Sequence, residues 1–175
     1  STNAKARVAL DLKQRFSRSL IWKLQNNFFK EKSVQAWSGE IVPFYITNNA
    51  FLAEAYAKVV YAWLRDWHMA GKLDPNQTVY IVELGTGSGR LAFLFQKFFF
   101  ALLEQSPLNQ IPVRYVMTDY VEETVAFWQG HPSLRPLVQA GRLEFARFDA
   151  EHTELPITLL PSNTVLSSEL ISNPM

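Results

Sequence analysis

The spacing of apolar side chains divides the chain into two parts with different periodicities. Over residues 5–70 the apolar positions recur every three or four residues, which is typical of amphipathic helices. We therefore predict two helices in this part and no strand. The first apolar set is Val8, Leu12, Phe16, Leu20 and Leu24, and the second is Leu52, Ala55, Tyr56, Val59, Val60, Trp63 and Trp67.

The ends of the second helix carry recognisable signals. Asn48 or Asn49 can cap its first turn, because an asparagine side chain accepts hydrogen bonds from free backbone N–H groups. Gly71 is a typical residue after a helix C-terminus, and Pro75 follows it. Residues 38–49 contain a proline and end in polar residues, so they are predicted to form the loop between the two helices.

From residue 78 the pattern changes to an alternation of strands and helices. Strands are predicted at 78–84, 113–119 and 142–149, with helices over 89–104 and from 121 to 129. Strands separated by helices of this length predict a parallel sheet with crossover connections. The expected fold class is α/β, with a Rossmann-like doubly wound parallel sheet preceded by an N-terminal helical region.

The length of 175 residues suits one hydrophobic core. Within it we expect an N-terminal helical cap region (1–75) and a Rossmann-like domain (76–175) that is incomplete at its C-terminus. The segment NTVLSSEL (163–170) is either a fourth strand, or the chain ends where that strand begins, near residues 173–174. We favour the second interpretation, which makes the sequence part of a longer protein. The first strand would then be an exposed sheet edge, where self-association can occur.

Composition narrows the class of protein. Hydrophobic content of 48%, charged content of 19% and a net charge of +1 are typical of a globular protein, and predict neither nucleic-acid nor membrane binding. The absence of cysteine excludes disulfides and thiolate metal sites, and suits a cytoplasmic location. His68, His131 and His152 lack the spacing of metal ligands, so no metal site is expected. Residues 1–40 hold eight Lys/Arg against three Asp/Glu, which we interpret as a solvated helical face.

The richest motif is IVELGTGSGRL (81–91), where a strand runs into glycines 85, 87 and 89 and then a helix. Glycine allows positive φ and close approach of a ligand to the backbone. A dinucleotide site requires G-x-G-x-x-G/A, and Arg90 occupies the third glycine position, which disfavours NAD or FAD. The phosphate-binding pattern G-x-x-x-x-G-K-[ST] is absent from the sequence.

The motif resembles motif I of the class I S-adenosylmethionine-dependent methyltransferases, and the resemblance covers residues 78–150. It implies that Glu83, Gly85, Thr86, Gly87 and Gly89 surround the methionine part of S-adenosyl-L-methionine.

The same resemblance assigns the two later strand ends. Asp119 would accept hydrogen bonds from the ribose hydroxyls, and Tyr120 would flank the adenine. Asp149 would accept the adenine amino group, and the backbone of Ala150 would donate to the ring. A simpler alternative is that both aspartates cap the helices that follow them.

The expected function is transfer of a methyl group from S-adenosyl-L-methionine to an unidentified acceptor, either a small molecule or a protein. The family's catalytic and substrate residues lie mainly after the fourth strand, so a chain ending here is expected to be inactive alone. Two alternatives stay open. One is a binding or scaffold module with a methyltransferase-like fold and no turnover, and the other is an NAD(P)-dependent oxidoreductase.

Overall fold

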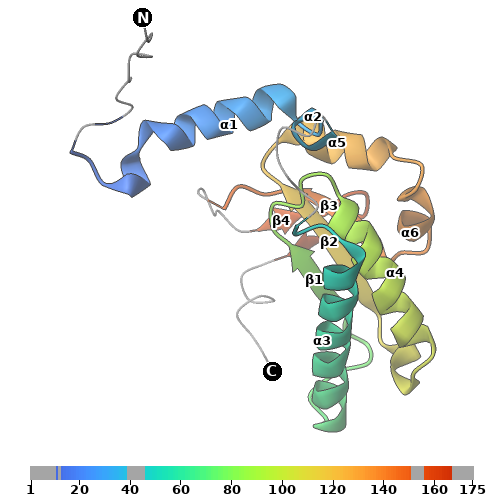
Figure 1. Ribbon diagram of the computed structural model, residues 1–175. Helices are drawn as coiled ribbons and strands as arrows, with labels where there is room; N and C mark the ends of the chain where they lie inside the picture. The colour runs from blue at the N-terminus through green and yellow to red at the C-terminus, as the bar shows by residue number, and fades with distance from the viewer. Residues whose placement is uncertain (1–10, 12, 39–45, 151–155, 167–175) are drawn as a thin grey trace, which may run out of the picture.

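The computed structural model describes residues 11, 13–38, 46–150 and 156–166. They form a mixed α/β structure whose three-stranded parallel sheet has helices packed against it (Figure 1), an arrangement compatible with a Rossmann-like fold. In chain order the elements are η1 (Phe16–Arg18), α1 (Leu20–Lys32), α2 (Gln35–Ser38), α3 (Ala50–Met69), β1 (Val79–Glu83), α4 (Arg90–Glu104), η2 (Pro107–Gln110), β2 (Val113–Asp119), α5 (Glu122–Gly130), α6 (Arg135–Gln139), β3 (Leu143–Arg147), β4 (Ile157–Thr158) and β5 (Val165–Leu166).

The sheet has the strand order β1-β2-β3, and both neighbouring pairs are parallel, as predicted. The register pairs Glu83 with Met117, and Asp119 with Arg147. On the side away from β2, β3 forms an antiparallel bridge between Phe145 and Leu160. Among the described strands, none pairs with the outer side of β1. The strand order runs in one direction, so the described residues contain no reversal of the kind that defines a doubly wound sheet.

The two faces of the sheet bury two separate hydrophobic clusters. Val79 and Ile81 of β1 face the helices, where they pack with α3, α4, α5 and α6. Tyr80 and Val82 point the opposite way, as alternation along a strand requires, and contact the β4–β5 region. Helix α3 shares the first cluster with the sheet, so residues 50–69 belong to the same core as the predicted Rossmann-like domain.

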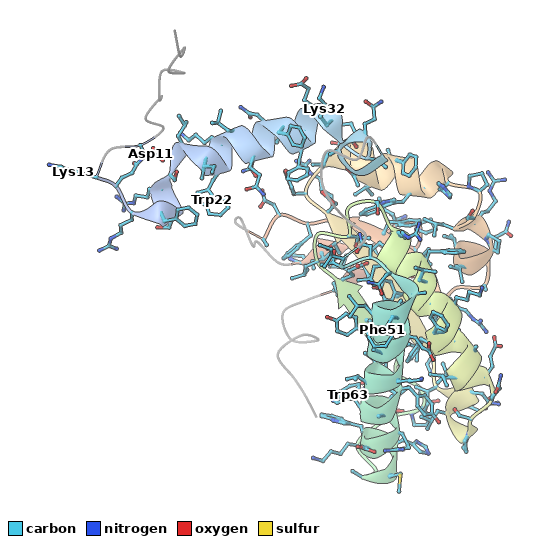
Figure 2. All side chains as sticks on the ribbon, in the orientation of Figure 1. Asp11, Lys13, Trp22, Lys32, Phe51 and Trp63 are labelled. Carbon is cyan, nitrogen blue, oxygen red and sulfur yellow. The ribbon has the colours of Figure 1, made fainter. Side chains whose placement is uncertain are left out.

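Helix α3 forms where the sequence predicts, but it buries a different face. Asn49 caps it, accepting a 3.0 Å hydrogen bond from the N–H of Leu52, and Gly71 follows its end with φ of +67°. The fully buried side chains are Ala53, Ala57 and Leu64. The predicted stripe was wrong in part, because Tyr56, Val59 and Trp63 are 53%, 65% and 45% exposed (Figure 2 labels Trp63).

The physical reason is the size of the residues on the two faces. Ala53 and Ala57 are small enough for α3 to lie close against α4, and close packing there recovers dispersion contacts along the helix. The larger aromatic face would hold the helices apart. Periodicity identifies apolar positions on α3, but it does not say which apolar face can approach a neighbour most closely.

The N-terminal helix begins later in the sequence than predicted. The regular spacing predicted a helix through Phe16 and Leu24, but the chain is extended at Ser19 and α1 begins at Leu20. The Ser19 side chain accepts from the N–H of Ile21 at 3.2 Å, and Asp11 accepts from the N–H of Leu20 at 2.9 Å. These acceptors satisfy N–H groups that a helix start leaves without partners.

Helix α1 extends away from the sheet (Figure 1) and none of its residues is buried. The predicted apolar face is therefore not part of the core: Phe16, Leu20 and Leu24 are 70%, 41% and 47% exposed. Val8 and Leu12, the first two members of that pattern, lie outside the described residues.

The last described segment is a short hairpin. Strands β4 and β5 pair antiparallel, with Ile157 opposite Leu166 and Thr158 opposite Val165. The predicted segment 163–170 therefore contains a strand at Val165–Leu166, but this strand pairs with β4 and not with β1. Residues 167–170 of that segment lie outside the described residues, as do residues 173–174, on which the second interpretation depends. None of the described helices combines the length and the apolarity needed to cross a bilayer.

Candidate functional site

The glycine loop connects β1 to α4 through three residues in the left-handed region. Gly85, Gly87 and Gly89 have φ of +64°, +60° and +78°, which is why side chains are disfavoured at these positions. A Cβ at Gly85 would meet nothing within 4 Å, so this end of the loop borders open space. A Cβ at Gly89 would lie 2.9 Å from Met117 Cε, so this glycine lets α4 start directly against the sheet.

Hydrogen bonds fix the loop to the end of β2. The N–H of Thr86 donates to the carbonyl of Thr118 at 2.9 Å, and the N–H of Thr118 donates back to Thr86 Oγ1 at 3.2 Å. The Thr118 hydroxyl donates to the Glu83 carbonyl at 2.7 Å. Thr86 and Thr118 are both buried. The loop is therefore held in one conformation by its neighbours, which is what a backbone binding surface requires.

Asp119 lies against the loop and is only 4% exposed. Its Oδ2 accepts from the N–H of Gly87 at 3.2 Å, and its Oδ1 accepts from the N–H of Val121 at 3.0 Å. Burial raises the pKa of this carboxyl group, while the backbone N–H groups of Val121, Gly87 and Tyr120 lower it. A carboxylate can accept about four hydrogen bonds, so a position remains for a further donor. The N-cap residue of α5 is Val121 and no side-chain hydrogen bond caps this helix, so the alternative role of Asp119 as a helix cap is not what the structure has.

Glu83 has an environment of its own at the end of β1. Burial raises the pKa of its carboxyl group to about 7, although hydrogen bonds from the Thr86 and Tyr115 hydroxyls act to lower it. Its Oε2 is buried and has no hydrogen-bond partner among the described residues. A buried acceptor without a donor costs about 1–3 kcal/mol, so this oxygen is suited to a donor that the described residues do not supply.

The predicted residues at the other strand ends lie along the same edge of the sheet. The N–H of Phe148 donates to the Asp119 carbonyl at 2.9 Å, which places the residues after β3 beside the end of β2. Tyr120 and Asp149 are half-buried here, and Ala150 is exposed. The structure thus joins Asp119 to the backbone of the glycine loop, and Glu83 to the hydroxyls of Thr86 and Tyr115.

Two contacts of this site were not predicted. The indole Nε1–H of Trp128, a fully buried residue of α5, donates to the Gly87 carbonyl at 3.0 Å. The Arg90 Nε–H donates to the Asn48 carbonyl at 3.1 Å and so links the start of α4 to the chain before α3. A buried tryptophan nitrogen needs an acceptor, which is a signal in the sequence, but only the fold shows which acceptor it meets.

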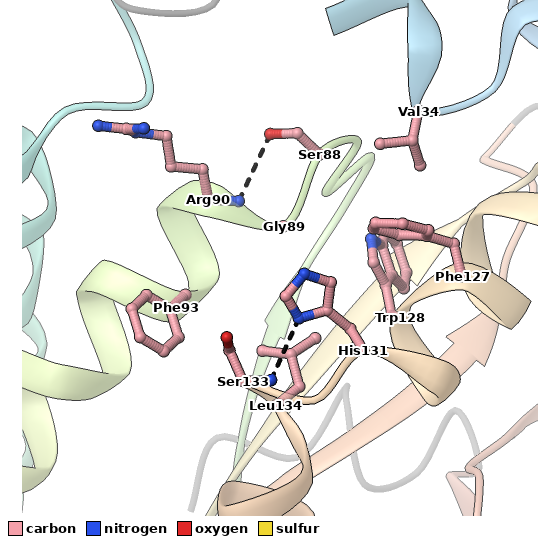
Figure 3. Close-up of a pocket in the computed structure, with 10 residues that line it drawn as sticks. All are labelled: Val34, Ser88, Gly89, Arg90, Phe93, Phe127, Trp128, His131, Ser133 and Leu134. Carbon is pink, nitrogen blue, oxygen red and sulfur yellow. Dashed lines mark hydrogen bonds between the residues drawn. The ribbon is translucent and has the colours of Figure 1, made fainter. Parts of the chain in front are cut away.

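A cavity of about 390 Å³ adjoins the other side of the loop (Figure 3). Ser88, Gly89 and Arg90 line it, but Glu83, Asp119 and Asp149 do not. It is therefore separate from the carboxylates that the sequence resemblance assigns to a cofactor.

Within the described ranges, no three His, Asp or Glu side chains come close enough to hold a metal ion. Comparison of the chain with protein-family models, with curated proteins and with solved structures returns no match.

Proposed function

We propose that the chain binds S-adenosyl-L-methionine at the carboxyl edge of the sheet and belongs to a methyltransferase that uses it as methyl donor. The observation that carries the proposal is the hydrogen bond between Gly87 and Asp119, residues 32 positions apart in sequence. It brings the glycine loop of β1 and the acidic residue of β2 into contact, as the sequence motif requires.

The chemistry of the side chains fits this cofactor, which presents an ammonium group, a diol and an exocyclic amine as donors. Glu83 would hold the ammonium group, because its buried Oε2 has an unused acceptor position among the described residues. Asp119 would accept from the ribose diol through the acceptor position that its backbone N–H donors leave available. Asp149 would accept from the adenine amine.

The energetic requirement is modest. Each charge-assisted hydrogen bond contributes roughly 1.5–3 kcal/mol, and micromolar affinity takes about 8 kcal/mol. Two or three such bonds, together with burial of the adenine, are sufficient. When bound, the cofactor supplies an electrophilic methyl group. The described residues act by holding the donor in one orientation, which positions it for in-line transfer to an oxygen, nitrogen or carbon acceptor.

A non-catalytic binding module is the second candidate, and one observation favours it. Helix α1 buries none of its residues, and α3 exposes Tyr56, Val59 and Trp63, so both helices present apolar surface. The NAD(P)-dependent alternative is weaker, because Arg90 occupies the position where the dinucleotide motif needs a small residue.

Isothermal titration calorimetry with S-adenosylhomocysteine and with NAD separates the three candidates. The methyltransferase proposal expects saturable binding of S-adenosylhomocysteine in the micromolar range and no binding of NAD. Tight binding of NAD would support the oxidoreductase. Binding of neither ligand by a folded chain would overturn the proposal in favour of the binding module.

A further inference from the structure

The cavity beside the glycine loop has features of a ligand site in its own right. It lies between the first turn of α4 and the end of α5, and its volume of about 390 Å³ is within the range of small-molecule pockets, roughly 300–1,000 Å³. Its lining residues are Val34, Ser88, Gly89, Arg90, Phe93, Phe127, Trp128, His131, Ser133 and Leu134.

Two phenylalanine rings form opposite walls of the cavity. Phe93 comes from α4 and Phe127 from α5, and Figure 3 shows them on opposite sides of the space. These two side chains are 39% and 44% exposed, so neither ring is fully buried in the hydrophobic core. An aromatic ligand between them would remove apolar surface of both rings from water, with little loss of side-chain freedom.

The polar groups of the cavity are suited to a ligand that carries a hydrogen-bond acceptor. His131 Nδ1 accepts from the N–H of Ser133 at 3.3 Å, so in the neutral ring the proton is on Nε2, which is a donor. Figure 3 shows this imidazole pointing into the space between Gly89 and Leu134. Among the described lining residues there is no carboxylate.

We propose that this cavity binds a planar aromatic molecule that carries a hydrogen-bond acceptor, such as a carboxamide or carboxylate. The ring lies between Phe93 and Phe127, and the acceptor bonds to His131 Nε2. Trp128 lines the cavity and also donates to the Gly87 carbonyl, so one side chain contacts both the cavity and the glycine loop.

Naphthalene derivatives with matched shapes test the proposed chemistry. The probes are 2-naphthamide and 2-naphthoate, with 2-naphthylmethylamine as a control that has the same ring but a cationic donor. Their binding is followed by ¹H–¹⁵N NMR of the chain without any cofactor. We expect saturable shifts at Ser133, Leu134, the Gly87 amide and the Trp128 indole N–H. The two acceptor probes should bind at least tenfold more tightly than the amine.

Two variants and a control locate the site. Phe127→Ala removes one aromatic wall and should weaken both acceptor probes about tenfold. His131→Phe keeps an aromatic ring but removes the donor, so it should weaken the acceptor probes and leave the amine unchanged. Phe51→Ala, at a 79% exposed side chain outside the cavity, should change nothing.

Several results would overturn the proposal: no saturable shifts, equal affinity for the amine, or unchanged affinities in both cavity variants. Since the probes are titrated without any cofactor, a negative result for this cavity does not contradict the proposed methyl-donor site. Failure of S-adenosylhomocysteine binding likewise leaves this cavity site untouched.

Discussion

Asp119 Oδ2 accepts a hydrogen bond of 3.2 Å from the backbone N–H of Gly87. This bond ties the acidic end of one strand to the glycine loop of its neighbour. Asp119 therefore helps to shape the loop, and under the proposed function the same carboxylate would also accept from the cofactor.

Substitution of Asp119 by Asn is expected to destabilise the fold. One of its two oxygens becomes an NH₂ group that cannot accept from Gly87 or Val121, so one buried N–H loses its partner. The loss should be about 1–3 kcal/mol in the free energy of unfolding, measured by urea denaturation. Glu123→Gln, at an exposed position of α5, is the control and should change stability by less than about 0.5 kcal/mol. Equal stability of D119N and the parent would refute the structural role of this carboxylate.

The Glu83 carboxyl group should make stability depend on pH. Burial raises its pKa from 4.5 to about 7, so between these values the folded chain keeps a proton that the unfolded chain releases. The free energy of unfolding therefore falls as pH rises from about 4.5 to about 7, by up to about 3 kcal/mol, and is level above that range.

The variant Glu83→Gln isolates this contribution, because it cannot ionise. Asp119 also has a raised pKa, so the comparison is the difference between the parent and E83Q at each pH. We expect E83Q to gain stability relative to the parent between pH 5 and pH 8, measured by urea denaturation. A difference that stays constant over this range would contradict the raised pKa.

Trp128→Phe tests the hydrogen bond that holds the other side of the loop. The variant keeps an aromatic ring in the core but leaves the Gly87 carbonyl without its indole donor, and the smaller ring packs less fully. The expected loss is about 1–3 kcal/mol in the free energy of unfolding. Trp63→Phe is the matched control, since Trp63 is 45% exposed, and it should have little effect. Similar losses in the two variants would show that Trp128 has no special contact.

A pair of substitutions on α3 tests which face of the helix is buried. Ala57→Leu adds three carbons at a fully buried position against α4, and overpacking of this kind costs about 1–3 kcal/mol or more. Val59→Ala changes an exposed side chain and should cost less than about 0.5 kcal/mol. Thermal unfolding of both variants and of the parent measures the two losses of stability. The reverse order would mean that the face predicted from periodicity, which includes Val59, is the buried one.

The part of the fold that the sequence predicted well is the part where local pattern and tertiary packing agree. The strand from Val79, the glycine loop and the strand ending at Asp119 were predicted within one or two residues. Each has a strong local signal, because β-branched residues, positive φ and a following helix all point to the same structure.

The rest depended on relations that a single sequence does not contain. The buried face of α3 is decided by how closely Ala57 can approach α4, and the start of α1 by a carboxylate at Asp11 that reaches Leu20. At the site, residue types predicted acidic groups near glycines. They did not show that Asp119 bonds to Gly87, or that Glu83 interacts with both Thr86 and Tyr115.

Cofactor binding at the glycine loop is tested by titrating the ¹⁵N-labelled chain with S-adenosylhomocysteine, followed by NMR in the parent, in Asp149→Asn and in Glu123→Gln. We expect saturable shifts at Gly85, Gly87 and Asp119 in the parent, unchanged affinity in E123Q and at least tenfold weaker affinity in D149N. No saturable shift at the glycine loop of the folded parent, or equal affinity in D149N and E123Q, would contradict it.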